Sequence, residues 1–278
     1  MRLSFKTRPQ HSEWQPIQDF WKEGDRIELY DAGWTFDHLD PIFSDRPGPV
    51  LEGWTMLAAL SGIVHRIRLG VLVTGNTYRH PAVLANMAAT LDVISGGRLE
   101  IGLGTGWVET EHRVYDIPLP SWKERFDRLE ETCEILDALL TREATNIDGP
   151  FHTLRGARAE PKPIQRPRPP IVIGGTGEKR TLRIAARWAD QWNLPAGAPD
   201  VLRHKVAVLH RHCAEIGRDP TEIEVSVKVK ADGDPIEFAD LVSDYRDAGA
   251  RHVIAMFEAP FDPSKLGAVA ERLRPMIT

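Results

Sequence analysis

The sequence predicts an α/β protein folded as a single (β/α)8 TIM barrel over residues 1–278. Short apolar stretches that alternate with period two recur eight times, and each is followed by a segment with the apolar spacing of a helix. Such eightfold alternation over roughly 250 residues is typical of a closed barrel of parallel strands. Of the 278 residues, 42% are hydrophobic, which suffices for one continuous core. An open doubly wound sheet is the alternative, because one misread strand would change the count.

Each element is read from its own pattern, and prolines and glycines mark several helix ends. Pro81 opens one helix at its first turn, while Gly33 and Gly217 follow the last turns of two others. A Pro/Gly-rich loop over 38–53 follows the second strand. The expected strands are 3–7, 34–37, 67–73, 99–103, 171–174, 191–194, 224–230 and 252–257. The expected helices are 14–31, 54–64, 81–95, 122–140, 178–188, 200–216, 235–248 and 264–276.

Polar residues follow the third and fourth strands, at the point where each strand ends. Two parallel strands joined through a helix need a right-handed crossover, so both ends lie at the same edge of the sheet. Ligands of parallel α/β folds bind beyond the carboxyl ends of the strands. Chemistry is therefore expected among these residues. They are Thr74, Asn76, Tyr78, Arg79 and His80 after the third strand, and Thr105, Gly106, Trp107, Glu109 and Glu111 after the fourth.

The segment 141–170, between the fourth and fifth strands, is too long for a simple connection and ends in a proline-rich stretch. Long loops of this kind commonly shape access to a site. We therefore expect an insertion on the active-site face. A domain boundary is the alternative, but neither flank could close a barrel alone.

A glycine-rich turn, Gly174, Gly175, Thr176 and Gly177, follows the fifth strand and precedes a helix. Backbone N–H groups and the helix dipole at such a place favour an anion, so the turn is expected to hold a phosphate, paired with Arg180. The spacing does not fit a dinucleotide fingerprint. A plain tight turn is the alternative.

Composition excludes several classes of protein. No apolar run approaches the roughly 20 residues of a membrane span, and the N-terminus enters a strand without a signal-peptide core, so a cytoplasmic protein is expected. The net charge is −5 and the 35 basic residues are scattered, which gives no footprint for nucleic acid. The histidines do not fall at metal-ligand spacing, so no metal is expected.

Four further residues are interpreted as structural. Cys133 and Cys213 lie on the apolar stripes of their helices, which predicts buried thiols. Arg68 and Glu100 alternate with the apolar residues of the third and fourth strands. We expect them to face the barrel interior and to pair there, because an unpaired buried charge is costly.

Three motifs carry a resemblance to a known family. Asp37-His38 at the second strand end, YRHPAVLANMAATLDVISGGRLEIGLGTGW and IGGTGEKR resemble the bacterial-luciferase-like flavoprotein superfamily. WTFDHLDPIFSD, PAVLANMAATLDVISGGRLE and IGGTGEKRTLRI are similar to its actinobacterial branch of F420-dependent oxidoreductases. The resemblance implies a (β/α)8 barrel, an isoalloxazine-type ring at the strand ends, a small-molecule substrate and a homodimer.

The resemblance also points to the kind of flavin. Luciferases that use reduced FMN have a phosphate-binding arginine where this chain has Thr105, and deazaflavin enzymes commonly have threonine there. Coenzyme F420 is therefore expected, with FMN as the alternative. By resemblance, the deazaflavin contacts are Asp37, His38, Leu72, Val73, Thr74, Thr105, Gly106, Trp107, Gly174, Gly175, Thr176, Gly177, Arg180 and Asn193. A non-proline cis peptide is implied at Leu72-Val73, with Val71-Leu72 as the second choice.

His38 is the candidate proton-handling residue, since a histidine near neutrality can serve as general acid or base. Related sugar-phosphate dehydrogenases carry a glutamate donor where this chain has Trp107, so Glu109 and Glu111 are the candidate assisting acids. The expected function is hydride transfer between F420 and a small organic substrate. An FMN-dependent monooxygenase and a non-catalytic flavin-binding protein are the alternatives.

Overall fold

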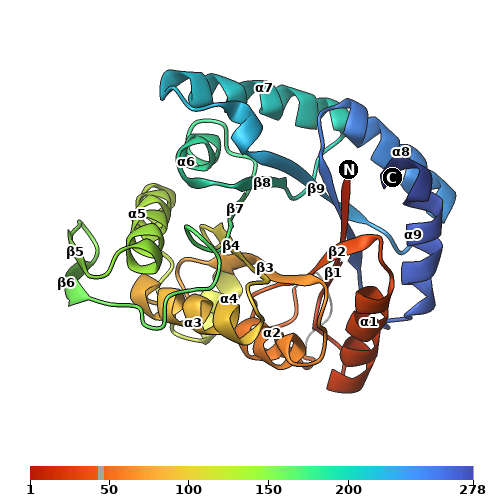
Figure 1. Cartoon of the computed structure of the whole chain (residues 1–278), viewed down its shortest axis with the longest axis horizontal. Helices are drawn as coiled ribbons and strands as arrows, with labels where there is room; N and C mark the ends of the chain where they lie inside the picture. Colours follow the sequence, from red (N-terminus) through yellow and green to blue (C-terminus); the bar gives the residue numbers. More distant parts are fainter. Residues whose placement is uncertain (43–46, 278) are drawn as a thin grey trace.

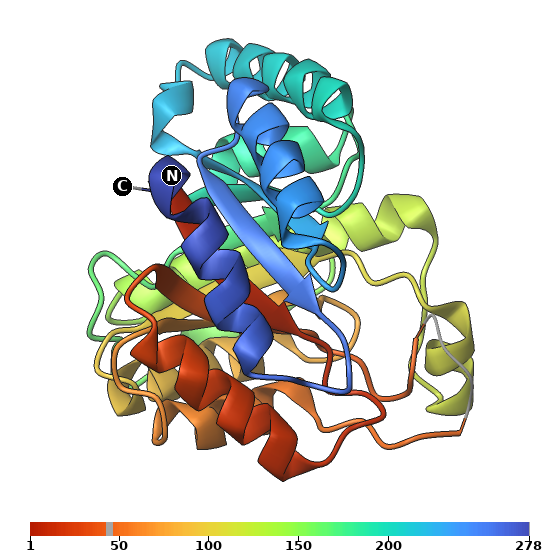
Figure 2. The same ribbon diagram turned by 90° about the vertical axis from the view of Figure 1, so that its right-hand side faces the viewer.

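The computed structural model describes residues 1–42 and 47–277, so part of the loop expected over 38–53 lies outside the described residues. Within them, eight parallel strands close into a barrel in the order β1-β10-β9-β8-β7-β4-β3-β2. The helices surround the barrel, and α1 and α9 lie side by side on one flank (Figures 1 and 2). The predicted (β/α)8 barrel is confirmed. No helix in the described residues is both long enough and apolar enough to span a membrane.

The strands are β1 Arg2–Thr7, β2 Tyr30–Thr35, β3 Arg68–Gly75, β4 Leu99–Gly104, β5 Thr145–Asp148, β6 Thr153–Ala157, β7 Ile171–Gly174, β8 Gln191–Leu194, β9 Glu224–Lys230 and β10 His252–Phe257. The helices are α1 Trp14–Arg26, α2 Gly53–Ser61, α3 Pro81–Ile94, α4 Glu109–Val114, α5 Trp122–Thr141, α6 Thr181–Trp188, α7 Pro199–Glu215, α8 Pro235–Asp247 and α9 Ser264–Ile277, with a short 3-10 helix at Pro220–Glu222.

Period-two alternation separates the outer core from the barrel interior. On β1, Phe5 points outward and packs edge-on against Phe20 and Trp21 of α1, with ring centroids 5.7 and 5.1 Å away. Ser4 points inward, where its Oγ lies 2.5 Å from His252 Nε2. Aromatic packing of this kind fixes the helices on the barrel. The outward face of β1 therefore packs against α1, and its inward face contributes polar groups to the barrel interior.

The predicted pairing of Arg68 with Glu100 is confirmed, and it lies at the amino-terminal end of the barrel. Glu100, which is 2% exposed, accepts from Arg68 at 2.6 Å and from Arg2 at 3.0 Å. Pairing with two guanidinium groups offsets the desolvation of a buried carboxylate. The two thiols, Cys133 and Cys213, are buried and free, as predicted.

Three helix boundaries differ from the prediction by three or more residues, and one of them is the end of α2, at Ser61 rather than at Val64. The first helix ends at Arg26 rather than near residue 31, and β2 begins at Tyr30 rather than at Trp34. Gly33 is therefore not a helix cap. It lies within β2, where a Cβ would come 2.5 Å from Trp21, so glycine permits the close approach of α1. The helix after β7 likewise begins at Thr181 rather than at residue 178.

From its length, we expect the segment 141–170 to lie over the strand ends. The structure shows that it does not. It contains the antiparallel hairpin β5-β6, which projects outside α5, away from the barrel (Figure 1). Gln165 then donates to Asp92 at 2.6 Å and to the Leu99 carbonyl at 2.8 Å, at the amino-terminal end of β4. After the hairpin, the chain thus packs against the amino-terminal end of the barrel. No residue of the segment 141–170 lines the cavity described below.

Candidate functional site

A cavity of about 620 Å3 opens at the carboxyl ends of the barrel strands. It receives side chains from β1, β3, β8 and β9, side chains from the segment that follows β2, and glycine-rich backbone from the ends of β4 and β7. The residues that line it are Lys6, Arg8, Phe36, Asp37, His38, Ile42, Leu72, Val73, Gly75, Tyr78, Gly104, Thr105, Gly106, Trp107, Trp122, Phe126, Gly174, Gly175, Thr176, Gly177, Thr181, Asn193, Pro195, Ala196 and Lys228.

One wall of this cavity is flat because two glycines flank Val73. A Cβ on Gly104 would lie 2.6 Å from Val73, and a Cβ on Gly174 would lie 2.9 Å from it. The β3-β4 register shifts between Val71 and Thr74, and the Leu72-Val73 peptide is cis, as predicted. A planar ring can therefore lie against this wall. The residues present fit an isoalloxazine-type group, for which a flat apolar backing is required.

His38 faces the cavity and is held from behind by Glu111. Its Nδ1 lies 2.9 Å from Glu111 Oε2, and the Tyr78 hydroxyl donates to the same oxygen at 2.5 Å. The backbone N–H of Leu39 donates to the other carboxylate oxygen. Burial disfavours the charged form, but these hydrogen bonds outweigh it and hold the pKa of Glu111 below its usual range. Glu111 is therefore a buried carboxylate acceptor that fixes the imidazole.

Asp37 lines the cavity, but its carboxylate is already engaged. Arg79 donates to both of its oxygens, at 2.6 and 3.0 Å, and also to Glu52 at 2.5 Å. Burial raises the pKa of Asp37, and the Arg79 guanidinium opposes the shift. This cluster ties the end of β2 to the start of α2.

Four predicted site residues do not line the cavity. Thr74 alternates with Val73, so its hydroxyl points outward and accepts from Trp54 Nε1 at 2.9 Å. Glu109 is exposed at the start of α4, and Glu111 lies behind His38. Arg180 pairs with Asp127 of α5, with its guanidinium 5.4 Å from the Phe126 ring centre. The sequence predicts Arg180 on a phosphate and Thr74 behind the ring, and the structure places both side chains elsewhere.

The glycine-rich turn lines the cavity, but not as the start of a helix. Because α6 begins at Thr181, residues 174–177 form a loop ahead of its first turn. The Gly175 N–H donates to the Asn193 carbonyl at 3.2 Å, so this donor is already used. The remaining backbone and the exposed Thr176 side chain form an open rim that can receive an anion.

Three cationic residues of the site were missed in the sequence. Lys6, Arg8 and Lys228 line the cavity from the β1 and β9 side. A signal existed, because Lys6 follows the inward-facing Ser4 by two residues and Lys228 follows the inward-facing Ser226 by two.

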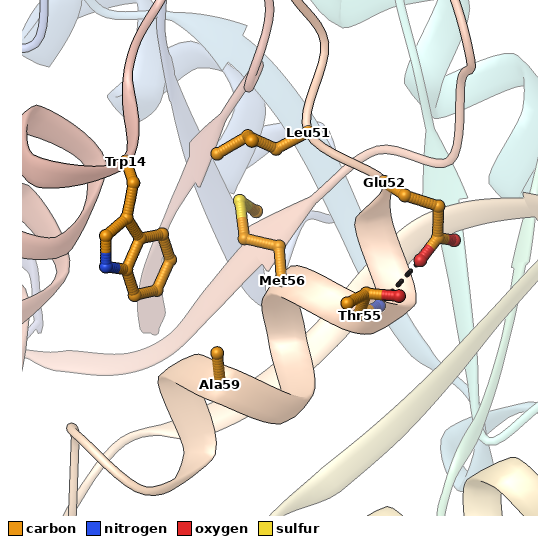
Figure 3. A pocket seen from close by; sticks show the side chains of 6 residues that line it. All are labelled: Trp14, Leu51, Glu52, Thr55, Met56 and Ala59. Carbon is orange, nitrogen blue, oxygen red and sulfur yellow. Dashed lines mark hydrogen bonds between the residues drawn. The ribbon is translucent and has the colours of Figure 1, made fainter.

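A smaller recess of about 220 Å3 lies between α1 and α2, where Trp14 and Leu51 face Met56 (Figure 3). It is almost wholly apolar, and Glu52 at its edge accepts from the Thr55 N–H at 2.7 Å.

Among residues 1–42 and 47–277, no cluster of three histidine, cysteine or acidic residues is arranged to hold a metal ion.

The chain is similar in sequence to proteins of a known family. The model of the family described as luciferase-like monooxygenase matches residues 28–232. An F420-dependent glucose-6-phosphate dehydrogenase of Microbacterium testaceum (strain StLB037) is 30% identical over 209 residues, which cover 74% of this chain and 61% of the relative. The chain thus spans less than two thirds of that relative's length.

Two solved structures share the whole fold. An F420-dependent secondary alcohol dehydrogenase in complex with an F420-acetone adduct superposes with a TM-score of 0.89 at 17% identity, covering 100% of this chain and 99% of the other. The monooxygenase RslO1 from Streptomyces bottropensis superposes with a TM-score of 0.81 at 22% identity, covering 100% of both chains. At these identities the likeness concerns the fold alone.

Proposed function

Because this chain belongs to the luciferase-like monooxygenase family, we propose that it is an F420-dependent oxidoreductase acting on a small organic substrate. The observation that carries the proposal is the arrangement of His38, which faces the same cavity as the flat, glycine-lined wall formed by the ends of β3, β4 and β7. A relative named as an F420-dependent glucose-6-phosphate dehydrogenase supports the choice of cofactor. Thr105, in place of a phosphate-binding arginine, favours the deazaflavin over FMN.

The cofactor would lie against Leu72 and Val73, with Thr105, Gly106 and Trp107 at its edges and the turn 174–177 near its phosphate. Asn193, which lines the cavity from β8, would also contact it. When bound, a deazaflavin supplies a ring carbon that carries hydride. The protein must then orient the substrate, exclude water and exchange a proton. Apolar side chains of Phe36, Ile42 and Trp122 around the cavity serve the second task.

His38 would exchange the proton. With Glu111 ionised and accepting at Nδ1, the Nε2 atom is directed to the cavity and can give a proton to, or take one from, a substrate oxygen. Glu111 touches no bound molecule in this arrangement, so we assign it a positioning role rather than that of a second acid. Glu109, exposed on α4, has no part in this step.

Substitution of His38 tests the proposal. The His38→Ala variant should lower turnover of F420 with secondary alcohols or hydroxy acids by about 10² to 10⁴, because the transition state loses its proton partner. Affinity for F420, measured by fluorescence titration, should stay within about threefold of wild type. A variant that loses F420 affinity but keeps full turnover once saturated would reduce His38 to a structural contact.

A further inference from the structure

The cavity has a cationic wall opposite its glycine-lined wall. Lys6 and Arg8 enter from β1, and Lys228 enters from β9. These two strands flank β10, which lies four strands from β4 in either direction around the barrel. The three side chains therefore start from the side of the barrel opposite Gly104 and Thr105, and the Lys6 ammonium group reaches across the interior to the Leu72 carbonyl of β3.

The side chains of Lys6 and Lys228 reach the cavity for a structural reason. Lys6 lies one inward step above Ser4, and Lys228 lies one inward step above Ser226, both members of a buried polar layer. Only 6% of Lys6 is exposed, and its ammonium group donates to the Leu72 carbonyl. Both lysines are thus placed by strand alternation, one layer above the polar floor of the barrel.

Within residues 1–42 and 47–277, neither ammonium group meets a carboxylate at ion-pair distance. Lys6 has the single contact with Leu72, and within the residues that the structure describes Lys228 has no hydrogen bond or ion pair. Arg8 pairs with Glu258, which also accepts from Lys230 at 3.1 Å. Asp37, the carboxylate among the lining residues, is held by Arg79.

The electrostatics of this wall favour an incoming anion. Burial, with Lys228 and Arg8 nearby, lowers the pKa of Lys6 well below its usual value. Burial and Arg8 lower the pKa of Lys228 to about 8, although Glu258 opposes the shift. A bound anion would relieve this repulsion, since a buried charge is stable only when it is paired.

Building on the proposed function, we propose that the substrate carries an anionic group, a carboxylate or a phosphate, which binds between Lys6 and Lys228. His38, at the end of β2 beside β1, is then left to face the uncharged part of the substrate. The cationic wall selects and orients the substrate, and the glycine-lined wall receives the cofactor.

The first test compares small probes that differ in charge. Butanoate, propyl phosphate and the neutral butanamide are each titrated into the purified protein by calorimetry, without any cofactor. At least one anion should bind about tenfold or more tightly than butanamide. Its affinity should fall as the pH rises through about 8, because Lys228 then loses its proton, while the affinity for butanamide stays level. Equal binding of all three probes would overturn the proposal.

The second test separates the substrate from the cofactor. Lys228→Met should remove the preference for anions by about tenfold, with butanamide and F420 affinities within about twofold of wild type. Lys230→Met is the matched control, because it loses the same charge from the same strand at a residue that does not line the cavity. It should keep the anion preference.

Two outcomes of these titrations would contradict different claims. If Lys228→Met weakened F420 binding rather than anion binding, the cations would serve the cofactor and the inference would be wrong. If the wild-type protein failed to bind F420 at all, the proposed function would fail. The anion titration contains no cofactor, so its result stands apart from that failure.

Discussion

The imidazole of His38 is oriented by a carboxylate that solvent does not reach. Glu111 accepts hydrogen bonds from His38, Tyr78 and the Leu39 N–H, and none of its surface is exposed. A buried network in which each partner is satisfied fixes the side chains that belong to it. The same network should also make the stability of the protein depend on pH.

We predict that Glu111→Gln flattens the acid limb of the stability profile. The pKa of Glu111 is lowered in the folded state, so its contribution is present above the unfolded value of 4.5 and is lost as the pH falls through the folded value. Glutamine does not titrate. Urea unfolding between about pH 6 and 3 measures the difference.

Glu109→Gln is the matched control for this prediction, because Glu109 is exposed on the same short helix. Its unfolding free energy should follow the wild-type pH dependence. An acid limb that is equally steep in wild type and Glu111→Gln would show that the Glu111 carboxylate does not carry this dependence.

Individual site residues could be located in the sequence to differing degrees. His38, Thr105 and Trp107 follow strands whose ends are easily recognised, and the structure places all three in the cavity. Glu111 was expected as an acid near the reaction, but the turn of α4 carries it behind the imidazole. Lys6 was missed because a lysine inside a strand is ordinarily solvated, and only the closed barrel turns it inward.

At the scale of elements, the connection from β7 to α6 is the part of the site that departs most from expectation. The helix starts three residues later than expected, so the glycine-rich turn is a loop with its own shape. The three residues between it and the helix carry Arg180 toward Asp127. An anion at this rim would therefore meet loop backbone and Thr176 rather than a guanidinium group.

We predict that Thr176→Asp weakens F420 binding by about tenfold or more, because a carboxylate at an exposed position on the rim repels the cofactor phosphate. Thr176→Asn, of nearly the same size and without charge, should stay within about threefold of wild type. Fluorescence titration at low ionic strength measures both. Equal affinities of the two variants would place the phosphate elsewhere.

The elements of the barrel could be predicted because each strand is buried between helices and interior and so has a clear apolar pattern. The end of α1 could not, because residues 27–31 are compatible with a helix, and it is pairing with Leu3 of β1 that makes Tyr30 part of β2. The hairpin β5-β6 was missed because its strands are short and largely exposed, so they lack a pattern.

At the scale of the whole molecule, the barrel brings a glycine-lined wall, cationic side chains and a histidine to one cavity. Strands β3, β4 and β7 supply a flat wall, strands β1 and β9 supply cations, and His38 enters from the end of β2 between them. Closure of the barrel is what sets these walls face to face, and it could be predicted from the eightfold repeat. The distance between the walls could not, because it depends on interior packing.

The most direct test of the central claim is equilibrium titration of the protein with F420 and with FMN, followed through tryptophan fluorescence. Trp107 lines the cavity and 47% of it is exposed, so a ring bound there should quench its emission. We predict that F420 binds at micromolar concentration or below, and that FMN binds at least tenfold more weakly, a difference of about 1.4 kcal/mol. Equal affinities, or FMN retained stoichiometrically through purification, would contradict the assignment of a deazaflavin enzyme.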